Sequence, residues 1–254
     1  MHKLLFGAAF LAIATGRVAT ADDQADARAI VDAGIKAQGG DAALGKFVAL
    51  YFKVKGTSYN GEMKAPVSFE MFIQGNDKLR TVLVDDQAKV SLIEVVNGKT
   101  GWTKDGDQAT ERLSDEQVNS RQELIYLSWA TMLVPLKGTG FRLSPLGETS
   151  VGGRKAVGVL VTHEKHSPLK MYFDAETHLP VNYQRKFKNV EYENVAIGNE
   201  VSEECVFSDY RNVQETRQYF RVVTFWDGMK VIDLTISEQK FYEKPLDDKL
   251  FTKP

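Results

Sequence analysis

Apolar and polar side chains alternate along most of this chain, and this period of two restricts its fold more than any other feature. The pattern begins at residues 50–55 and 67–73, where every second side chain is apolar. Three dipeptides typical of tight hairpin turns interrupt it: Asn97-Gly98, Asp105-Gly106 and Asp227-Gly228. Because successive side chains of a strand point to opposite faces, the pattern predicts about eleven antiparallel strands.

Two segments depart from the alternation and predict helices. Residues 27–35 place apolar side chains at helical spacing, and Gly39-Gly40 follows them as a C-cap would. The second helix is expected to begin at Ser114, which forms a capping box with Gln117, and to run to about Leu133. Its apolar side chains gather toward one side, so it should pack against the sheet.

A sheet of this predicted size does not stay flat, because each pair of strands adds a twist of roughly 20 to 25 degrees. The sheet therefore curls and acquires a concave face. The second helix is well placed to lie across that face, with the first helix packed nearby. The predicted fold is mainly β with two helices, a curved antiparallel half-barrel with a helical lid on its concave face. An apolar space between the sheet and the helix would bind a hydrophobic ligand.

The start of the chain has the features of a cleavable secretory signal peptide. Lys3 supplies positive charge, residues 4–14 are apolar or small without interruption, and Ala19-Thr20-Ala21 has the small-x-small pattern of a cleavage site. The apolar run is shorter than the roughly 20 residues that span a bilayer, and no later run is long enough. We expect cleavage near Ala21, rather than a buried first helix. Residues 22–254 would then form a single domain, located in a periplasm or secreted.

The charge balance argues against a polyanionic partner. The whole chain has 32 basic and 34 acidic residues, and loss of the first 21 removes Lys3 and Arg17. The remaining net charge, near −4, gives no reason to expect nucleic acid or an anionic membrane surface as partner. We expect a monomer.

Nothing in the chain predicts catalysis or a cofactor. Cys205 is the single cysteine, so no intrachain disulfide can form, and its place in an alternating strand predicts a small buried apolar residue. A catalytic thiol would need a base beside it, and no histidine flanks Cys205. No Gly-x-Ser-x-Gly nucleophile motif is present either. We therefore expect a protein without enzymatic activity and without a cofactor.

Two polar stretches invite a metal-site interpretation that their spacing does not favour. His163 and His166 are three residues apart, which on extended chain points them to opposite faces, and no third ligand is close in sequence. A solvent-exposed turn is the favoured interpretation. A second, acidic stretch lacks the spacing of a calcium loop, so a solvated hairpin or sheet edge is favoured there. Its residues are Glu191, Glu193, Glu200, Glu203 and Glu204. No metal is expected.

The order of elements, together with several turn-and-strand stretches, resembles the LolA/LolB-like superfamily. The matching stretches are residues 77–80, 97–102 with Gln108, 172–174 through 179–181, and 245–251. They extend over nearly all of the chain after the signal peptide. Members of this superfamily are half-barrel periplasmic proteins, among them carriers of bacterial lipoproteins. The resemblance implies that acyl chains bind on the concave face.

The resemblance also implies a role for Arg80, which matches an arginine that ties the helical lid to the barrel. A buried arginine keeps its charge and needs hydrogen-bond partners, so it would hold a lid or meet a ligand head group. The alternative is that Arg80 faces solvent, because Leu79 and Leu83 alternate with it. The residues expected to bind the ligand are Arg80, Phe69, Met71, Trp102, Val118, Ile125, Trp129 and Met132.

Non-covalent binding of a hydrophobic or lipidated ligand is the function that these features favour. Burying a long acyl chain of roughly 300 to 400 Å² is worth up to ~10 kcal/mol before ordering costs, which suffices for a carrier. A second class of function is compatible with the same features. A protein-interaction or envelope-stress sensing domain would use the same concave face to recognise a partner segment.

Overall fold

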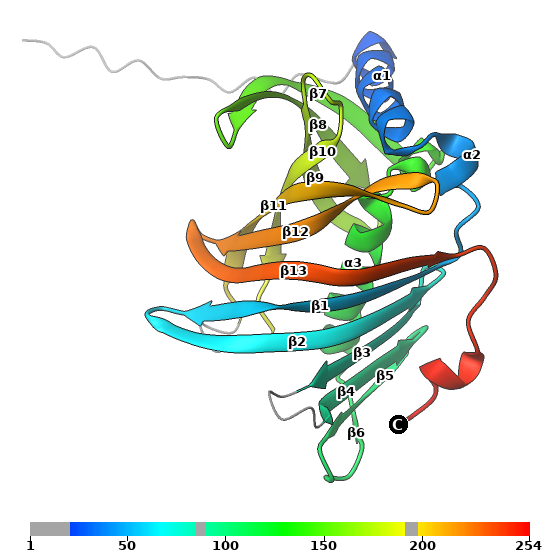
Figure 1. Cartoon of the computed structure of the whole chain (residues 1–254), viewed down its shortest axis with the longest axis vertical. Coiled ribbons are helices and arrows are strands. Elements are labelled where there is room, and N and C mark those ends of the chain that lie inside the picture. The colour runs from blue at the N-terminus through cyan, green and yellow to red at the C-terminus, as the bar shows by residue number, and fades with distance from the viewer. Residues whose placement is uncertain (1–20, 85–89, 191–197) are drawn as a thin grey trace, which may run out of the picture.

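The computed structural model describes residues 21–84, 90–190 and 198–254, and Figure 1 shows their arrangement. Three α-helices are present, α1 (Ala21–Gln38), α2 (Asp41–Leu44) and α3 (Asp115–Ala130), with two 3-10 helices, η1 (Val134–Lys137) and η2 (Asp248–Phe251). The strands are β1 (Ala49–Asn60), β2 (Met63–Gln74), β3 (Lys78–Val84), β4 (Val90–Asn97), β5 (Thr100–Asp105), β6 (Glu111–Arg112), β7 (Phe141–Val151), β8 (Arg154–His163), β9 (His166–Asp174), β10 (Pro180–Lys188), β11 (Glu200–Val213), β12 (Thr216–Trp226) and β13 (Met229–Tyr242).

All thirteen of these strands form one antiparallel sheet, in the order β6-β5-β4-β3-β2-β1-β13-β12-β11-β10-β9-β8-β7. Neighbours in the sheet are neighbours in sequence except at its centre, where β1 pairs with β13 and places Leu50 opposite Phe241. The edge strands β6 and β7 do not pair with each other, so the curved sheet is an open half-barrel, as predicted (Figure 1). The strand number exceeds the prediction partly because β6 has two residues, too few to show alternation.

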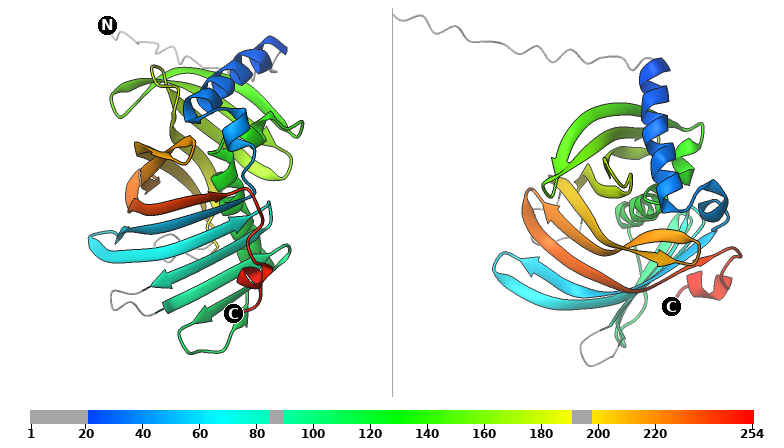
Figure 2. Two further views of the ribbon diagram at one scale, coloured as in Figure 1. Left: turned by 45° about the vertical axis from the view of Figure 1, so that its right-hand side comes forward. Right: turned by 45° about the horizontal axis from the view of Figure 1, so that its top comes forward.

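Helix α3 connects the two edges of the sheet. It follows β6 and leads through η1 to β7, so the chain has to cross from one edge to the other, and Figure 2 shows α3 running across the strands. Its buried Val118 and Ile125 share one core with Ile73 of β2 and Leu79 of β3. The α3 side of the sheet is therefore its concave, core-forming face.

The boundaries of α3 follow its local chemistry. The predicted capping box is confirmed, because Gln117 N donates to Ser114 Oγ over 3.2 Å and Ser114 N donates to Gln117 Oε1 over 2.9 Å. The predicted end near Leu133 is wrong, since the helix stops at Ala130. Leu133 has a φ of 65°, and the chain passes there into η1, so an α-helical hydrogen-bond ladder cannot continue.

Helix α1 covers the sheet near edge strand β7 (Figure 2). Its buried Ala27, Val31 and Ile35 belong to the core, and Gln24 Oε1 accepts a hydrogen bond of 2.7 Å from Leu143 N of β7. The predicted glycine cap is confirmed at Gly39, whose φ is 127°. A Cβ at Gly39 would lie 2.6 Å from a backbone oxygen, so this approach also requires glycine.

The C-terminal segment packs on the opposite, convex face of β3 to β5. Phe251 of η2 is completely buried there, and Asn97 Nδ2 donates to its carbonyl oxygen over 3.3 Å. Lys78 of β3 forms a 2.6 Å ion pair with Asp248 of η2. Val95 is likewise inaccessible although it alternates with core residue Val96, because this segment covers it. The sheet is thus covered on both faces at this end.

Candidate functional site

The concave face of β2 carries apolar side chains that are only partly buried. Val67, Phe69 and Met71 alternate along the strand and pack against the core, whereas Glu70 points the other way and pairs with Lys53 at 3.0 Å. Val222 of β12 and Ile232 of β13 are also partly buried against the same core. An apolar surface therefore extends over the concave face beyond the completely buried interior.

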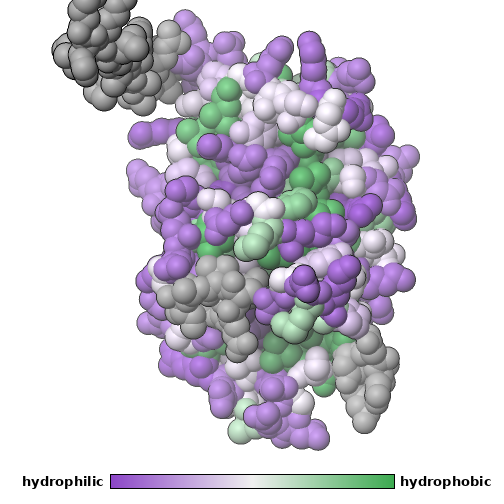
Figure 3. All heavy atoms as spheres, turned by 90° about the vertical axis from the view of Figure 1, so that its left-hand side faces the viewer, coloured by the Kyte–Doolittle hydropathy of each residue, from purple (hydrophilic) through white to green (hydrophobic). Residues whose placement is uncertain are grey.

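Figure 3 views the molecule from the side on which the β1–β2 and β12–β13 hairpins end in Figure 1. Hydrophobic side chains are visible there at several places down the middle, with hydrophilic side chains around them. Such a surface, apolar inside a polar surround, is typical of a site for an apolar ligand.

A charged pair lies inside the half-barrel, between β10 and β11. Arg185 and Glu203 are opposite each other in register, and Arg185 Nε lies 2.7 Å from Glu203 Oε1. Tyr183 Oη and Trp226 Nε1 also donate to the Glu203 carboxylate, over 3.0 and 3.2 Å. Burial, the largest single influence, lowers the pKa of Arg185, but the charge of Glu203, its hydrogen bond with Arg185, and the nearby Tyr183 and Glu123 together outweigh burial, so the pKa is raised. The cost of burying both charges is therefore offset by their mutual attraction and by the hydrogen bonds to Glu203, as a buried ion pair requires.

Cys205 neighbours this pair on β11 and behaves as predicted. Its side chain is buried, and its sulfur lies 3.2 Å from Thr224 Oγ1. Burial, reinforced by the charge of Glu203, raises the pKa of the thiol to about 12. A thiol in this state is not a nucleophile at neutral pH.

A groove of about 840 Å³ runs beside α3, between that helix and the β8–β9 turn. His166 Nδ1 lies 2.7 Å from Glu123 Oε1 of α3, and the imidazole stacks on the Tyr126 ring with centroids 3.9 Å apart. The ring of Phe141, at the start of β7, lies nearly parallel to that of Tyr126, with centroids 6.3 Å apart. Aromatic rings and one carboxylate thus form a wall of a ligand-sized groove.

The prediction that His163 and His166 point to opposite faces is wrong. The turn between β8 and β9 makes them cross-strand partners, and their rings are 5.0 Å apart. The extended-chain argument fails because a hairpin reverses the chain between the two residues. Even so, no three His, Cys, Asp or Glu side chains in the described ranges are grouped as a metal site.

The acidic stretch has a different environment from the one expected. Glu191 and Glu193 lie outside the described residues. Glu200 is exposed and pairs with Lys186 at 2.6 Å, which fits a solvated edge. The expectation is wrong for Glu203, which is only 8% exposed because its strand turns it into the half-barrel.

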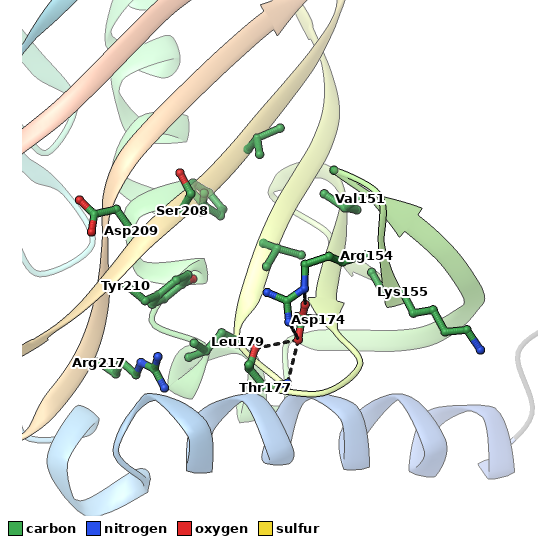
Figure 4. A pocket seen from close by; sticks show the side chains of 15 residues that line it. Val151, Arg154, Lys155, Asp174, Thr177, Leu179, Ser208, Asp209, Tyr210 and Arg217 are labelled. Carbon is green, nitrogen blue, oxygen red and sulfur yellow. Dashed lines mark hydrogen bonds and ion pairs between the residues drawn. The ribbon is translucent and has the colours of Figure 1, made fainter.

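A second, smaller pocket of about 370 Å³ lies between β8, β10 and β11, near α1 (Figure 4). Its deepest carboxylate is that of Asp174, which accepts from Thr177 N over 2.8 Å and Thr177 Oγ1 over 2.9 Å, and pairs with Arg154 Nε at 3.0 Å. These bonds hold the β9–β10 turn. We assign this pocket a structural role, since its buried acid is satisfied within the protein.

The eight residues predicted to bind ligand fall in three places. Phe69 and Met71 lie on the concave face, and the α3-side residues Val118, Ile125, Trp129 and Met132 are in the core or packed against it. Arg80 and Trp102 point to the convex face, because their sequence neighbours Leu79 and Gly101 face α3. The hydrogen bond shown for Arg80 goes to the carbonyl oxygen of Leu250, not to α3.

Sequence reasoning missed the polar residues of the interior. Arg185 lies two residues from the buried Tyr183 and Glu203 two residues from the buried Cys205, so each charge shares the inward face of its strand. A charged residue in the period of a buried strand face is the signal that could have identified them. Glu123 and Tyr126 showed no pattern of their own, because their partner His166 is distant in sequence.

Comparisons with known proteins identify the fold. No protein-family model and no curated protein matches the sequence. A LolA superfamily protein from Nitrosomonas europaea is similar in structure, with a TM-score of 0.56 and 11% identity over 89% of this chain and 97% of that one. A domain described as an outer membrane lipoprotein-sorting protein, from Vibrio parahaemolyticus, gives a TM-score of 0.55 at 9% identity and the same coverage.

A DUF1329 family protein from Desulfovibrio piger is similar as well, with a TM-score of 0.57 and 12% identity over 89% of this chain and 97% of that one. The chain therefore has a LolA-like fold. Identities this low show a shared fold and leave function to the site itself. Among the described helices, none combines the length and hydropathy that crossing a bilayer requires.

Proposed function

We propose that this protein is a carrier that binds a hydrophobic or acylated ligand non-covalently on its concave face. The supporting observation is the partly exposed apolar surface of Phe69, Met71 and their neighbours, on the face of the sheet that α3 crosses (Figure 2). Hiding a long acyl chain against it is worth up to ~10 kcal/mol before ordering costs, so the proposal requires no catalytic group.

Helix α3 is the proposed lid. Its side chains reach the turns that end the neighbouring strands, since Trp129 Nε1 donates to Gly75 O and Gln122 Nε2 to Gly98 O, each over 2.7 Å. Arg121 adds a bidentate pair with Glu94 of β4, at 2.8 and 2.9 Å. Movement of α3 would break these bonds and the pair between Glu123 and His166, and Val118, Ile125 and, just after the helix, Met132 would then face the ligand together with Phe69 and Met71.

The proposal includes export. The features of residues 1–21 support cleavage after Ala21 and a periplasmic or secreted location. N-terminal sequencing of the exported protein is expected to begin at Asp22. A start more than a few residues away would overturn this part of the proposal without affecting the binding site.

Ligand binding is tested with a solvatochromic fatty-acid probe and two matched variants of β2. Phe69→Asn, on the concave face, is expected to weaken probe binding at least tenfold. Phe72→Asn, on the convex face of the same strand beside Tyr51, is expected to leave it within about twofold. Circular dichroism and urea titration check that both variants are folded.

Absence of probe binding by well-folded protein would overturn the carrier proposal, as would equal effects of the two variants. Native mass spectrometry of the protein purified from its own envelope is expected to show co-purified lipid. Specific retention of a protein segment, with no lipid and no probe binding, would instead support the protein-interaction alternative.

A further inference from the structure

The groove beside α3 contains two buried polar atoms without a hydrogen-bond partner among the described residues. They are Tyr126 Oη and Glu123 Oε2, and both residues line the groove. Tyr126 as a residue is 8% exposed, and the Glu123 side chain is 21% exposed although its Oε2 atom is inaccessible. Buried polar atoms are nearly always paired, and two orphans in one ligand-sized groove indicate that a bound group completes their hydrogen bonds.

The two atoms specify what that group must do. Glu123 already uses Oε1 with His166, and its remaining carboxylate oxygen accepts hydrogen bonds but donates none. Burial, and then the charge of Glu123, raises the pKa of the Tyr126 phenol, which therefore keeps its proton and is able to donate. A hydroxyl both donates and accepts, so a hydroxyl-bearing head supplies both kinds of hydrogen bond that these two atoms lack. A carboxylate or phosphate head would instead be repelled by Glu123.

The remaining polar lining of the groove is suited to a neutral, hydroxyl-bearing group. Asn76, Asn119 and Gln122 supply amides, each of which donates and accepts. The exposed Lys165 of the β8–β9 turn lines the groove, and the charge of Arg185, which is paired with Glu203, also acts on Tyr126 and Glu123. Side-chain amides of this kind recognise hydroxyls without requiring a charge on the ligand.

The other wall of the groove is the boundary of the apolar core. Ile125 is completely buried in that core, and Trp129 and Phe141 pack against it, while all three line the groove. An amphiphile with its head at Tyr126 would therefore place its first methylene groups against apolar side chains. A volume of about 840 Å³ lies within the range of roughly 300 to 1,000 Å³ that is usual for small-molecule sites.

We propose that this groove is a head-group site for an amphiphile with a neutral, hydroxyl-bearing head, which donates to Glu123 Oε2 and accepts from Tyr126 Oη. The inference rests on the proposed carrier function, because it concerns the polar end of the same ligand.

The test compares lipids that share one oleoyl chain and differ in the head. Monoolein carries two free hydroxyls, methyl oleate has no hydrogen-bond donor, and oleate is anionic. The binding of each lipid is measured by its displacement of the solvatochromic probe from wild-type protein at pH 8. Monoolein is expected to bind about tenfold more tightly than methyl oleate and than oleate, because only its head completes both hydrogen bonds.

Tyr126→Phe removes the hydroxyl and keeps the ring that stacks on His166, so it should fold. It is expected to weaken monoolein binding about five- to tenfold and to leave methyl oleate unchanged. Glu123→Gln, in which an NH₂ group competes for the acceptor position, should do the same. Tyr172→Phe is the matched control, because Tyr172 lies on the outer face between the buried Met171 and Phe173.

Two outcomes would overturn the inference, and they are distinguishable. The first is that monoolein and methyl oleate bind equally, or that Tyr126→Phe and Glu123→Gln affect both lipids alike. The groove then does not distinguish between head groups, and water alone provides the hydrogen bonds of Tyr126 Oη and Glu123 Oε2. If none of the three lipids displaces a bound probe, or no probe binds, the carrier function itself fails and this inference fails with it.

Discussion

Arg80 Nη1 donates to the carbonyl oxygen of Leu250 over 3.2 Å, across a separation of 170 residues. The bond joins β3 to the C-terminal 3-10 helix on the convex face, away from α3. Burial lowers the pKa of Arg80 from its ordinary value, yet a guanidinium stays charged at any physiological pH. Its position indicates that Arg80 holds the C-terminal segment rather than the lid.

Replacing Arg80 by leucine tests this assignment. Arg80→Leu is expected to lower the free energy of unfolding by about 1 to 2 kcal/mol, because a charged hydrogen bond to a partly buried carbonyl is lost. Arg112→Leu, at an exposed position of β6, should cost under about 0.5 kcal/mol. Urea titration measures both, and stopped-flow release of the fatty-acid probe should be the same for both. Faster or slower release from Arg80→Leu alone would show that Arg80 acts on the lid after all.

Phe251 is the apolar anchor of the same segment. Because its ring is completely buried, Phe251→Ala is expected to cost about 3 to 5 kcal/mol and to increase proteolysis near the C-terminus. Thermal and urea unfolding measure the loss. A cost below about 1 kcal/mol would mean that the segment contributes little to the folded state.

Single substitutions in the ion pair between Arg185 and Glu203 should strongly lower the free energy of unfolding. Arg185→Met is expected to cost about 3 to 5 kcal/mol, because it leaves a buried carboxylate without its counter-charge. Adding Glu203→Leu should recover part of that loss. Lys186→Met is the matched control, since Lys186 and Glu200 form an exposed pair between the same two strands, which should be worth under about 1 kcal/mol. A similar cost for both single variants in urea titrations would contradict the interpretation.

Asp174 predicts a pH-dependent contribution to stability. Burial alone would raise its pKa, but hydrogen bonds from Thr177 and Glu176 and the charge of Arg154 outweigh burial, so the net pKa is lowered from 3.8 (Figure 4). A lowered pKa in the folded state stabilises the protein above the unfolded pKa, and this contribution is lost as pH falls through the folded pKa.

Asp174→Asn is therefore expected to cost about 1 to 3 kcal/mol at pH 7 and progressively less below about pH 4. Urea titrations of both proteins between pH 7 and pH 3 measure the difference. A difference that does not change over this range would show that the charge of Asp174 is unimportant and only its shape matters.

Local patterns in the sequence were sufficient for the elements themselves. The alternation at residues 50–55 and 67–73 predicts strands because side-chain direction in a strand depends on its own backbone alone. The start of α3 at Ser114 was predictable for the same reason, since a capping box is closed within four residues. The half-barrel followed from the number of strands, because twist accumulates with every pair.

Tertiary structure decided which face each residue serves and what covers it. Alternation shows that Leu79 and Arg80 lie on opposite faces but does not show that η2 covers the face of Arg80, because that packing joins segments far apart in the chain. The partnership of Glu123 with His166, and the approach of Tyr126 to both, likewise exist only once α3 lies beside the β8–β9 turn. Elements were therefore determined by short-range backbone geometry, whereas the candidate site was determined by long-range packing, which no local pattern encodes.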